Sequence, residues 1–347
     1  MGKAMRHLAW LLLFGMILAG CEEKAPVVPV HKEKEEAPGS VKIGFSMDTL
    51  EEERWVRDRD LFKQAVEDQG AEVLITEARG DDALQVLQAE TLIAEGVDVL
   101  VIVPYNAEAA AAIVQKAHKA GIQVVSYDRL VRNADIDLYV SFDNERVGEL
   151  QAGAITELVP KGKYVYIGGA ETDYNAHLLK KGVFDELKDP IDRGEIQVVY
   201  DEWTDNWLPE NAYDNMKEAL KANDGDIDAV IAANDATAGM AEKALEEAGL
   251  AGKIPVAGQD AELNAVRRIV QGTQAMTVYK PINILAEEAA SLAISIARGE
   301  YIDTDKKINN GKIEVPSVLL QPTAVNKANL DTTIIADHFH TREEVYE

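Results

Sequence analysis

Side chains able to bind a polar ligand follow the ends of short apolar segments in both halves of the sequence. They are acids, amides, basic groups and indoles rather than Ser, His or Cys: Asp48, Arg54, Trp55, Asn106, Asp128, Arg129, Asp173, Asn175, Trp203, Trp207, Asn234, Asp260 and Lys280. A carboxylate only accepts hydrogen bonds, Arg and Lys only donate them, and Asn does both. A sugar hydroxyl donates one hydrogen bond and accepts up to two. This set can therefore satisfy the hydroxyls of a neutral polyol with charge-assisted bonds.

Trp55 and Trp207 suit the other part of a sugar, its apolar C–H faces. Indole offers the largest flat aromatic surface, and both residues stand among polar neighbours in the sequence. We therefore expect the two indoles to sandwich a pyranose ring from opposite sides. The alternative is that they are core residues, as most tryptophans are.

Several of the candidates also fit purely structural roles. Asp128 and Arg129 could form a surface ion pair, and we expect Asp235, next to Asn234, to be a helix N-cap. The acidic run at 223–226 lacks the spacing and the final Glu of a calcium loop. We expect a surface turn there, and we predict neither a metal site nor a cofactor.

Strands that alternate with helices are expected to position these side chains. Apolar runs rich in strand formers occupy 41–45, 71–75, 97–103, 122–126, 164–167, 196–200, 227–232 and 254–257, and a helical apolar period covers 54–69. Such alternation favours an α/β fold with parallel sheets covered on both faces. Ligands of open α/β sheets bind beyond the carboxyl ends of the strands, which is where the candidates lie.

The two halves of the chain repeat this scheme. In the first half Asn106 follows one strand and Asp128 follows the next, and in the second half Asn234 and Asp260 stand in the same places. The length of 347 residues exceeds the size at which one core keeps growing. We expect two similar α/β lobes whose strand ends face each other.

Charge and motifs exclude several classes of function. The chain has 61 acidic and 35 basic residues and a net charge of -26, so its surface repels phosphate backbones and nucleic-acid binding is not expected. The sequence shows no Ser-His-Asp pattern, metal cluster or phosphate-binding loop, and Gly168-Gly169 is not a dinucleotide fingerprint. We expect a binding protein rather than an enzyme.

The amino-terminal segment reads as a secretion signal. An apolar run at 8–18 follows a short basic start; it is shorter than the about 20 residues that span a bilayer and has the size of a signal-peptide core. The single cysteine, Cys21, excludes an internal disulfide and follows Leu18-Ala19-Gly20, which resembles a bacterial lipobox.

The lipobox resemblance implies cleavage before Cys21 and acylation of its thiol. Residues 1–20 would then be a signal peptide, and 21–40, rich in charge and proline, a lipid-anchored flexible tether. The alternative is a plain secretory signal with an incidental cysteine.

Beyond Val41 the sequence resembles the type I periplasmic sugar-binding proteins of bacterial ABC transporters, and among them the D-xylose binders. The stretches that carry the resemblance are long and contiguous: 53–55, 103–106, 127–129, 141–145, 147–151, 207–211, 234–239, 258–261 and 277–281. The resemblance implies two Rossmann-like lobes joined by a three-strand hinge, with connections near 143–144, 280–281 and 315–316. The lobes would comprise 41–142 with 281–315, and 143–280 with 316–347.

The resemblance also implies which of the candidates bind the sugar. Position by position, the contacts fall on Arg54, Asp128, Arg129, Asp173, Asn175, Asn234, Asp260 and Lys280, and the stacking indoles are Trp55 and Trp207. We expect a monomeric, extracytoplasmic lipoprotein, in the periplasm or on the outer face of the cell membrane. It would capture D-xylose and deliver it to a membrane permease.

The sequence departs from the family pattern beside the site, at Tyr174 and His177. Other ligands therefore stay open, namely ribose, arabinose or glucose, and so does a role as a sugar sensor for a chemoreceptor or kinase. A sugar-responsive repressor shares the two-lobed architecture, but the signal segment occupies the place of a DNA-binding head.

Overall fold

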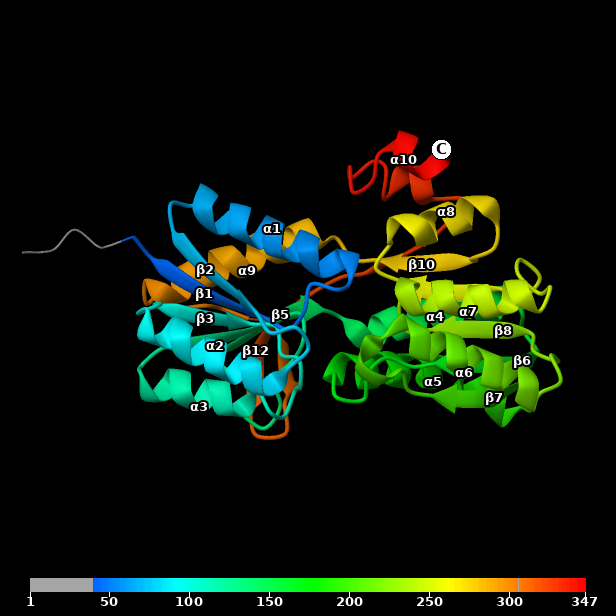
Figure 1. The fold of residues 1–347 in the computed structure, drawn as a ribbon, viewed down its shortest axis with the longest axis horizontal. Helices are drawn as coiled ribbons and strands as arrows, with labels where there is room; N and C mark the ends of the chain where they lie inside the picture. Colours follow the sequence, from blue (N-terminus) through cyan, green and yellow to red (C-terminus); the bar gives the residue numbers. More distant parts are fainter. Residues whose placement is uncertain (1–39, 305) are drawn as a thin grey trace, which may run out of the picture. The chain divides into compact units, whose positions relative to one another are not determined.

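The computed structural model describes residues 40–304 and 306–347. The predicted signal peptide, the lipid attachment at Cys21 and the tether up to residue 39 lie outside the described residues. Residues from Ser40 to Glu347 form one compact unit that contains a seven-stranded and a six-stranded sheet (Figure 1). Within this unit, no helix has both the length and the hydropathy that a membrane span requires.

The first sheet has the strand order β11-β12-β5-β4-β3-β1-β2, and all neighbours are parallel except β11 and β12. Its strands are β1 (Lys42–Met47), β2 (Glu72–Glu77), β3 (Val99–Ile102), β4 (Gln123–Tyr127), β5 (Leu138–Phe142), β11 (Lys306–Asn309) and β12 (Glu314–Leu320). Helices cover both faces: α1 (Glu53–Asp68) and α9 (Ile282–Ala297) pack on one, and α2 (Asp82–Ala94) and α3 (Ala111–Lys119) on the other.

Strand β3 shows why this sheet is apolar throughout. Successive side chains of a strand point to opposite faces, so Val99 and Val101 pack under α1 and α9 while Leu100 and Ile102 pack against α2 and α3. The sequence of a strand that is buried on both faces is therefore a continuous apolar run, without the alternation of apolar and polar residues that marks a half-exposed strand.

The second sheet has the order β13-β10-β9-β8-β6-β7, parallel except for β13. Its strands are β6 (Gly162–Ile167), β7 (Ile196–Glu202), β8 (Ala229–Ala232), β9 (Val256–Gln259), β10 (Met276–Tyr279) and β13 (Thr323–Asn326). Helices α4 (Asn144–Leu158) and α5 (Tyr174–Asp192) cover one face, and α6 (Pro209–Ala222) and α7 (Asp235–Glu247) the other. Helices α8 (Leu263–Gln271) and α10 (Arg342–Tyr346) share a smaller core beyond β10. The predicted fold class is confirmed.

The chain passes between the two sheets three times: after β5, after β10 and after β12. The family resemblance implies the third passage near Val315-Pro316, but β12 stays paired with β5 through Leu320. Pro316 lies within β12, opposite Lys307 of the edge strand β11, and the register with β5 begins one residue later, at Ser317. We therefore propose lobes of 41–142 with 281–320 and of 143–280 with 321–347.

Helices α4 and α5 approach closely through two glycines. A Cβ atom on Gly148 would lie 2.1 Å from the Leu179 carbonyl oxygen, and one on Gly182 would lie 2.0 Å from the Glu145 carbonyl oxygen. Both neighbours are backbone atoms, which cannot turn aside. The interface therefore requires glycine at both positions.

Gly182→Ala is expected to lower the free energy of unfolding by about 2 kcal/mol, because the added methyl group pushes the two helices apart. The measurement is the urea midpoint of unfolding, which should fall. Gly153→Ala on α4 is the matched control, since its Cβ would meet its nearest neighbour at 3.7 Å. The control should be neutral or stabilising by about 0.5–1 kcal/mol, as alanine favours helix. Equal midpoints for Gly182→Ala and the wild type would contradict this packing.

Candidate functional site

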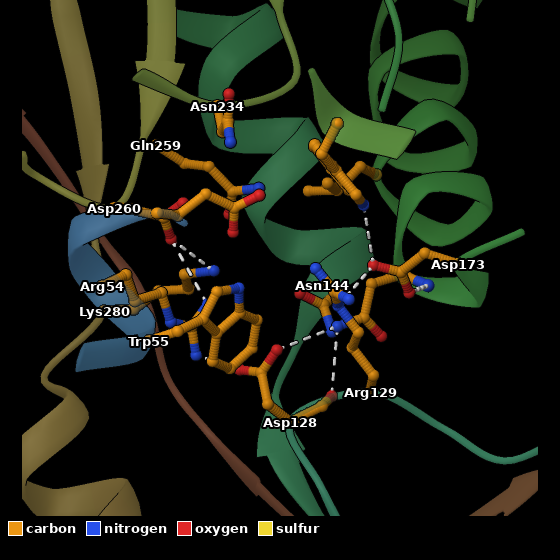
Figure 2. A pocket seen from close by; sticks show the side chains of 14 residues that line it. Arg54, Trp55, Asp128, Arg129, Asn144, Asp173, Asn234, Gln259, Asp260 and Lys280 are labelled. Carbon is orange, nitrogen blue, oxygen red and sulfur yellow. Dashed lines mark hydrogen bonds and ion pairs between the residues drawn. The ribbon is translucent and has the colours of Figure 1, made fainter. Parts of the chain in front are cut away.

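All ten predicted contact residues line one cavity at the carboxyl ends of strands from both sheets (Figure 2). The full lining is Glu52, Arg54, Trp55, Asp128, Arg129, Asn144, Asp173, Asn175, Leu179, Trp207, Asn234, Gln259, Asp260 and Lys280. That these side chains bind a ligand stays a prediction; what the structure shows is their convergence. Within the described residues, no group of acids, His or Cys is arranged to hold a metal.

Most of the lining residues lie at the end of a strand or at the start of a helix. Arg54 and Trp55 stand in the first turn of α1, and Asp128 and Arg129 directly follow β4. From the second half come the residues at the start of α5 and α7, the turn before α6, and the ends of β9 and β10, namely Asp173, Asn175, Asn234, Trp207, Asp260 and Lys280. The topology thus brings segments distant in sequence to one place.

Arg54 lies between carboxylates of both halves. Its Nε donates to Asp58 at 3.0 Å, its Nη2 pairs with Asp128, and its Nη1 lies 3.4 Å from Asp260. Burial alone would lower the pKa of Arg54, but the three carboxylates outweigh burial and raise it. Arg54 is therefore a fixed, fully charged donor.

Arg129 repeats this arrangement on the other side of the cavity. It pairs with Asp48 of the first half, and its Nε donates to Asp173 of the second at 2.8 Å. Asp173 also accepts from Nε1 of Trp207 at 3.2 Å. Each of the two arginines thus pairs with carboxylates of both halves of the chain.

Asp128 is held from both halves as well. Its Oδ1 accepts from Nδ2 of Asn175 at 3.2 Å, and its carbonyl oxygen accepts from the hydroxyls of Tyr139 and Ser141. These bonds stabilise a backbone in the left-handed region, φ 58°. Burial would raise the pKa of Asp128, but nearby cations, Arg54 first, outweigh burial and lower it.

On the second half, Lys280 and Asp260 form an ion pair of 2.7 Å. Gln259 donates from Nε2 to the Ala233 carbonyl at 2.8 Å, which leaves its buried Oε1 without a partner among the described residues. Asn234 caps α7: its Oδ1 accepts from Thr237 N at 2.8 Å, and Figure 2 shows its nitrogen end turned toward the cavity.

The prediction that Asp235 caps this helix is wrong. Asp235 is fully buried one position later and accepts from Thr277 Oγ1 at 2.7 Å and from Gln274 Nε2 at 2.8 Å. Burial raises its pKa to about 7. Sequence alone cannot tell which of two adjacent residues, Asn234 or Asp235, is the N-cap, since Asn and Asp are both good caps.

The two indoles lie on opposite halves. Trp55 packs beneath the guanidinium groups of Arg54 and Arg129, with centroid distances of 4.6 and 4.9 Å. Trp207 lies against Gly169, where an added Cβ would come within 2.1 Å of the ring. Each indole also joins the apolar core of its own half. Both are therefore core residues that also line the cavity, and their stacking on a ligand stays a prediction.

The cavity itself is small, about 30 Å³, because charged side chains from the two halves contact one another across it. Ligand pockets commonly measure about 300–1,000 Å³. A ligand of ring size would therefore fit only if some of these contacts were broken.

Other sequence candidates lie elsewhere. Tyr174 and His177 line a separate hollow, where Tyr174 stacks on Arg132 at 4.0 Å. Trp203 packs on His177 rather than in the cavity, and Asn106 bonds the backbone of its own loop. The departures from the family pattern are thus outside the cavity lining.

Sequence reasoning missed four lining residues and Asp58, the carboxylate that supports Arg54. Gln259 and Asn144 belong to stretches that carry the family resemblance, so their signal was present. Asp58 follows Arg54 by four residues on one helix, a spacing that predicts contact. Leu179 and Glu52 had no such signal.

Comparisons with known proteins agree with this geometry. The model of the periplasmic binding protein domain matches residues 43–301. Two D-xylose-binding periplasmic proteins, from Escherichia coli K12 and Haemophilus influenzae, are 50% and 49% identical over 305 and 306 residues, covering 88% of this chain and 92% of each relative. A solved carbohydrate transporter solute-binding protein from Chloroflexus aurantiacus, in complex with D-glucose, is 29% identical with a TM-score of 0.83, covering 88% of this chain and 98% of that one.

Proposed function

Because this chain belongs to the periplasmic binding protein family, we propose that it captures one monosaccharide, D-xylose, between its two lobes and delivers it to an ABC transporter permease. The observation that carries the proposal is the convergence of ten predicted side chains from both halves on one cavity. The two relatives of about 50% identity, both named for D-xylose binding, support the choice of sugar.

The hydrogen-bonding groups suit a neutral polyol. Arg54, Arg129 and Lys280 are donors, Asp128, Asp173 and Asp260 are acceptors, and Asn175 and Asn234 can be both. Each of the three cationic donors faces a carboxylate of the second half, so a hydroxyl inserted between donor and acceptor would bond to both. A sugar that lacks such a hydroxyl would leave a buried charge unpaired, and discrimination against it should be steep.

We propose that Trp55 and Trp207 stack on the two C–H faces of the ring. They enter the cavity from different halves, so both can contact the ring only when the halves are together. Glucose would be rejected sterically, because it adds a hydroxymethyl group to the pentose outline.

Hinge closure is the proposed mechanism. Contacts from both lobes favour the closed state, so the sugar shifts the equilibrium toward it. The closed molecule presents a surface that the permease can distinguish from the open one. Micromolar affinity, about -8 kcal/mol, would be strong enough for capture and weak enough for release.

The proposed location is the periplasmic space or the outer face of the cell membrane, with a lipid anchor at Cys21. The support is in the sequence: an apolar run of signal-peptide size ends in Leu18-Ala19-Gly20-Cys21. The relatives' names place those proteins in the periplasm. The anchor would hold the sugar-binding unit near the permease.

Calorimetric titration with D-xylose, L-arabinose, D-ribose and D-glucose tests the sugar. We expect saturable binding of D-xylose at micromolar concentration and much weaker binding of the others. Asp260→Ala should weaken D-xylose binding by roughly 100-fold or more, because it removes charge-assisted bonds of about 1.5–3 kcal/mol each. Asp226→Ala, at an exposed acid paired with Lys163, is the control and should bind as the wild type does.

Binding of glucose in preference to D-xylose would leave the family assignment unchanged and contradict the choice of D-xylose as the ligand. Binding of none of the four sugars would contradict the proposed function.

Membrane fractionation tests the anchor. The wild-type chain, expressed in a bacterium with lipoprotein processing, is expected in the membrane fraction, and Cys21→Ser is expected in the soluble extracytoplasmic fraction, since a single residue carries the acyl chains. Equal distribution of both proteins would show that Cys21 is not an anchor.

A further inference from the structure

The C-terminal segment at 337–347 places a buried histidine outside the cavity. Helix α10, red in Figure 1, lies beside α8 of the second half, and His340 just before it is 1% exposed. His340 does not line the cavity, and the proposed function assigns it no role.

The two ring nitrogens of His340 have different partners. Nε2 lies 2.7 Å from the carbonyl oxygen of Ala261, and Nδ1 lies 3.4 Å from Nη2 of Arg57. A carbonyl can only accept, so Nε2 carries the proton; a guanidinium can only donate, so Nδ1 offers its lone pair. The neutral Nε2–H tautomer is therefore the one that satisfies both contacts.

These contacts join two elements of the cavity. Ala261 directly follows Asp260. Both have positive backbone φ angles, 92° at Asp260 and 53° at Ala261. Residues other than glycine adopt this conformation only when their surroundings hold them in it. Arg57 lies one turn after Arg54 on α1. The imidazole thus connects the turn that carries Asp260 to the helix that carries Arg54.

The neighbouring Phe339 strengthens the same connection. Its carbonyl accepts from Nη1 of Arg57 at 3.0 Å, and the guanidinium stacks over its ring at 4.8 Å. On the other side the ring packs edge-on against Tyr279 at 5.1 Å, immediately before Lys280. The segment therefore contacts both halves next to three of the cavity's charged residues.

We propose that His340 is a positioning residue: by bonding Ala261 and Arg57 together it holds Asp260 toward the sugar and stabilises the closed arrangement of the lobes. The inference rests on the proposed sugar-binding function of the same site. Protonation of His340 would place a hydrogen on Nδ1 facing the Arg57 guanidinium, where two donors meet, and the connection would break.

Acidification should therefore weaken sugar binding. The charged groups that face His340 are Arg57 and Glu53 of α1 and Glu344 of α10. Burial first, and then Arg57, lower the pKa of His340 below its ordinary value of 6.5; the hydrogen bond to the Ala261 carbonyl and the two glutamates act in the opposite direction. The neutral ring, which supports sugar binding, is thus fully populated at neutral pH. Its contribution to affinity is lost as the pH falls below 6.5 and the ring takes up a proton.

Two substitutions separate the contacts of the ring. In His340→Gln the amide nitrogen reaches the position of Nε2 and can donate to Ala261, whereas in His340→Asn the shorter amide reaches only the position of Nδ1. Neither side chain titrates. His338→Asn is the matched control, because His338 is exposed, and asparagine tolerates its left-handed backbone, φ 56°.

The dissociation constant and dissociation rate of D-xylose are measured for the full chain from pH 7.5 to pH 5.5. The wild type should weaken several-fold toward pH 5.5. His340→Gln, which keeps the bond to Ala261 but lacks an acceptor for Arg57, should bind several-fold more weakly than the wild type at pH 7.5 and keep that affinity at pH 5.5. His340→Asn should bind about tenfold more weakly at both pH values, with faster dissociation, and His338→Asn should follow the wild type throughout.

Wild-type affinity and pH profile in both His340 variants would overturn the inference, and so would a loss of affinity that keeps the wild-type pH profile. Failure of the wild type to bind any of the four sugars would instead remove the proposed function on which the inference rests. Unchanged thermal midpoints of the sugar-free variants exclude a general loss of stability as the cause.

Discussion

Two buried guanidinium groups, each paired with carboxylates from both halves of the chain, are the interaction on which the candidate site depends. A buried charge is costly unless it is paired and hydrogen-bonded. Arg54 and Arg129 meet this requirement with Asp58 and Asp48 behind them and with Asp260 and Asp173 across the cavity. The lining is therefore one mutually dependent set of charges.

The same arrangement allows the halves to separate. On separation Arg54 would keep Asp58 and Arg129 would keep Asp48, because these pairs lie within the first half. On the second half, Asp260 would keep Lys280. Asp173 would lose its ion pair with Arg129 but keep the hydrogen bonds from Trp207 Nε1 and Asn175 N. Since each of these charged groups keeps a partner, the open and closed states can be close in free energy. A ligand with modest differential affinity then decides between them.

Much of the fold and the cavity could be predicted from the sequence because the signals are local. Apolar runs such as 97–103 mark buried strands, and polar residues directly after them must gather at one sheet edge. What could not be predicted depends on packing between distant segments. The close approach at Gly148 and Gly182, the burial of Asp235 and the contact of His340 with Ala261 leave no periodic pattern in the sequence. The third connection, which the resemblance implies near 315–316, lies further along the chain because β12 stays paired with β5 through Leu320.

Solution X-ray scattering of the compact unit at 40–347, with and without saturating D-xylose, tests the central claim that one sugar is held by both halves at once. The account predicts a smaller radius of gyration with D-xylose than without it, and no such change for Asp260→Ala. Saturable D-xylose binding by calorimetry with an unchanged radius of gyration would contradict the claim that binding and closure are one event.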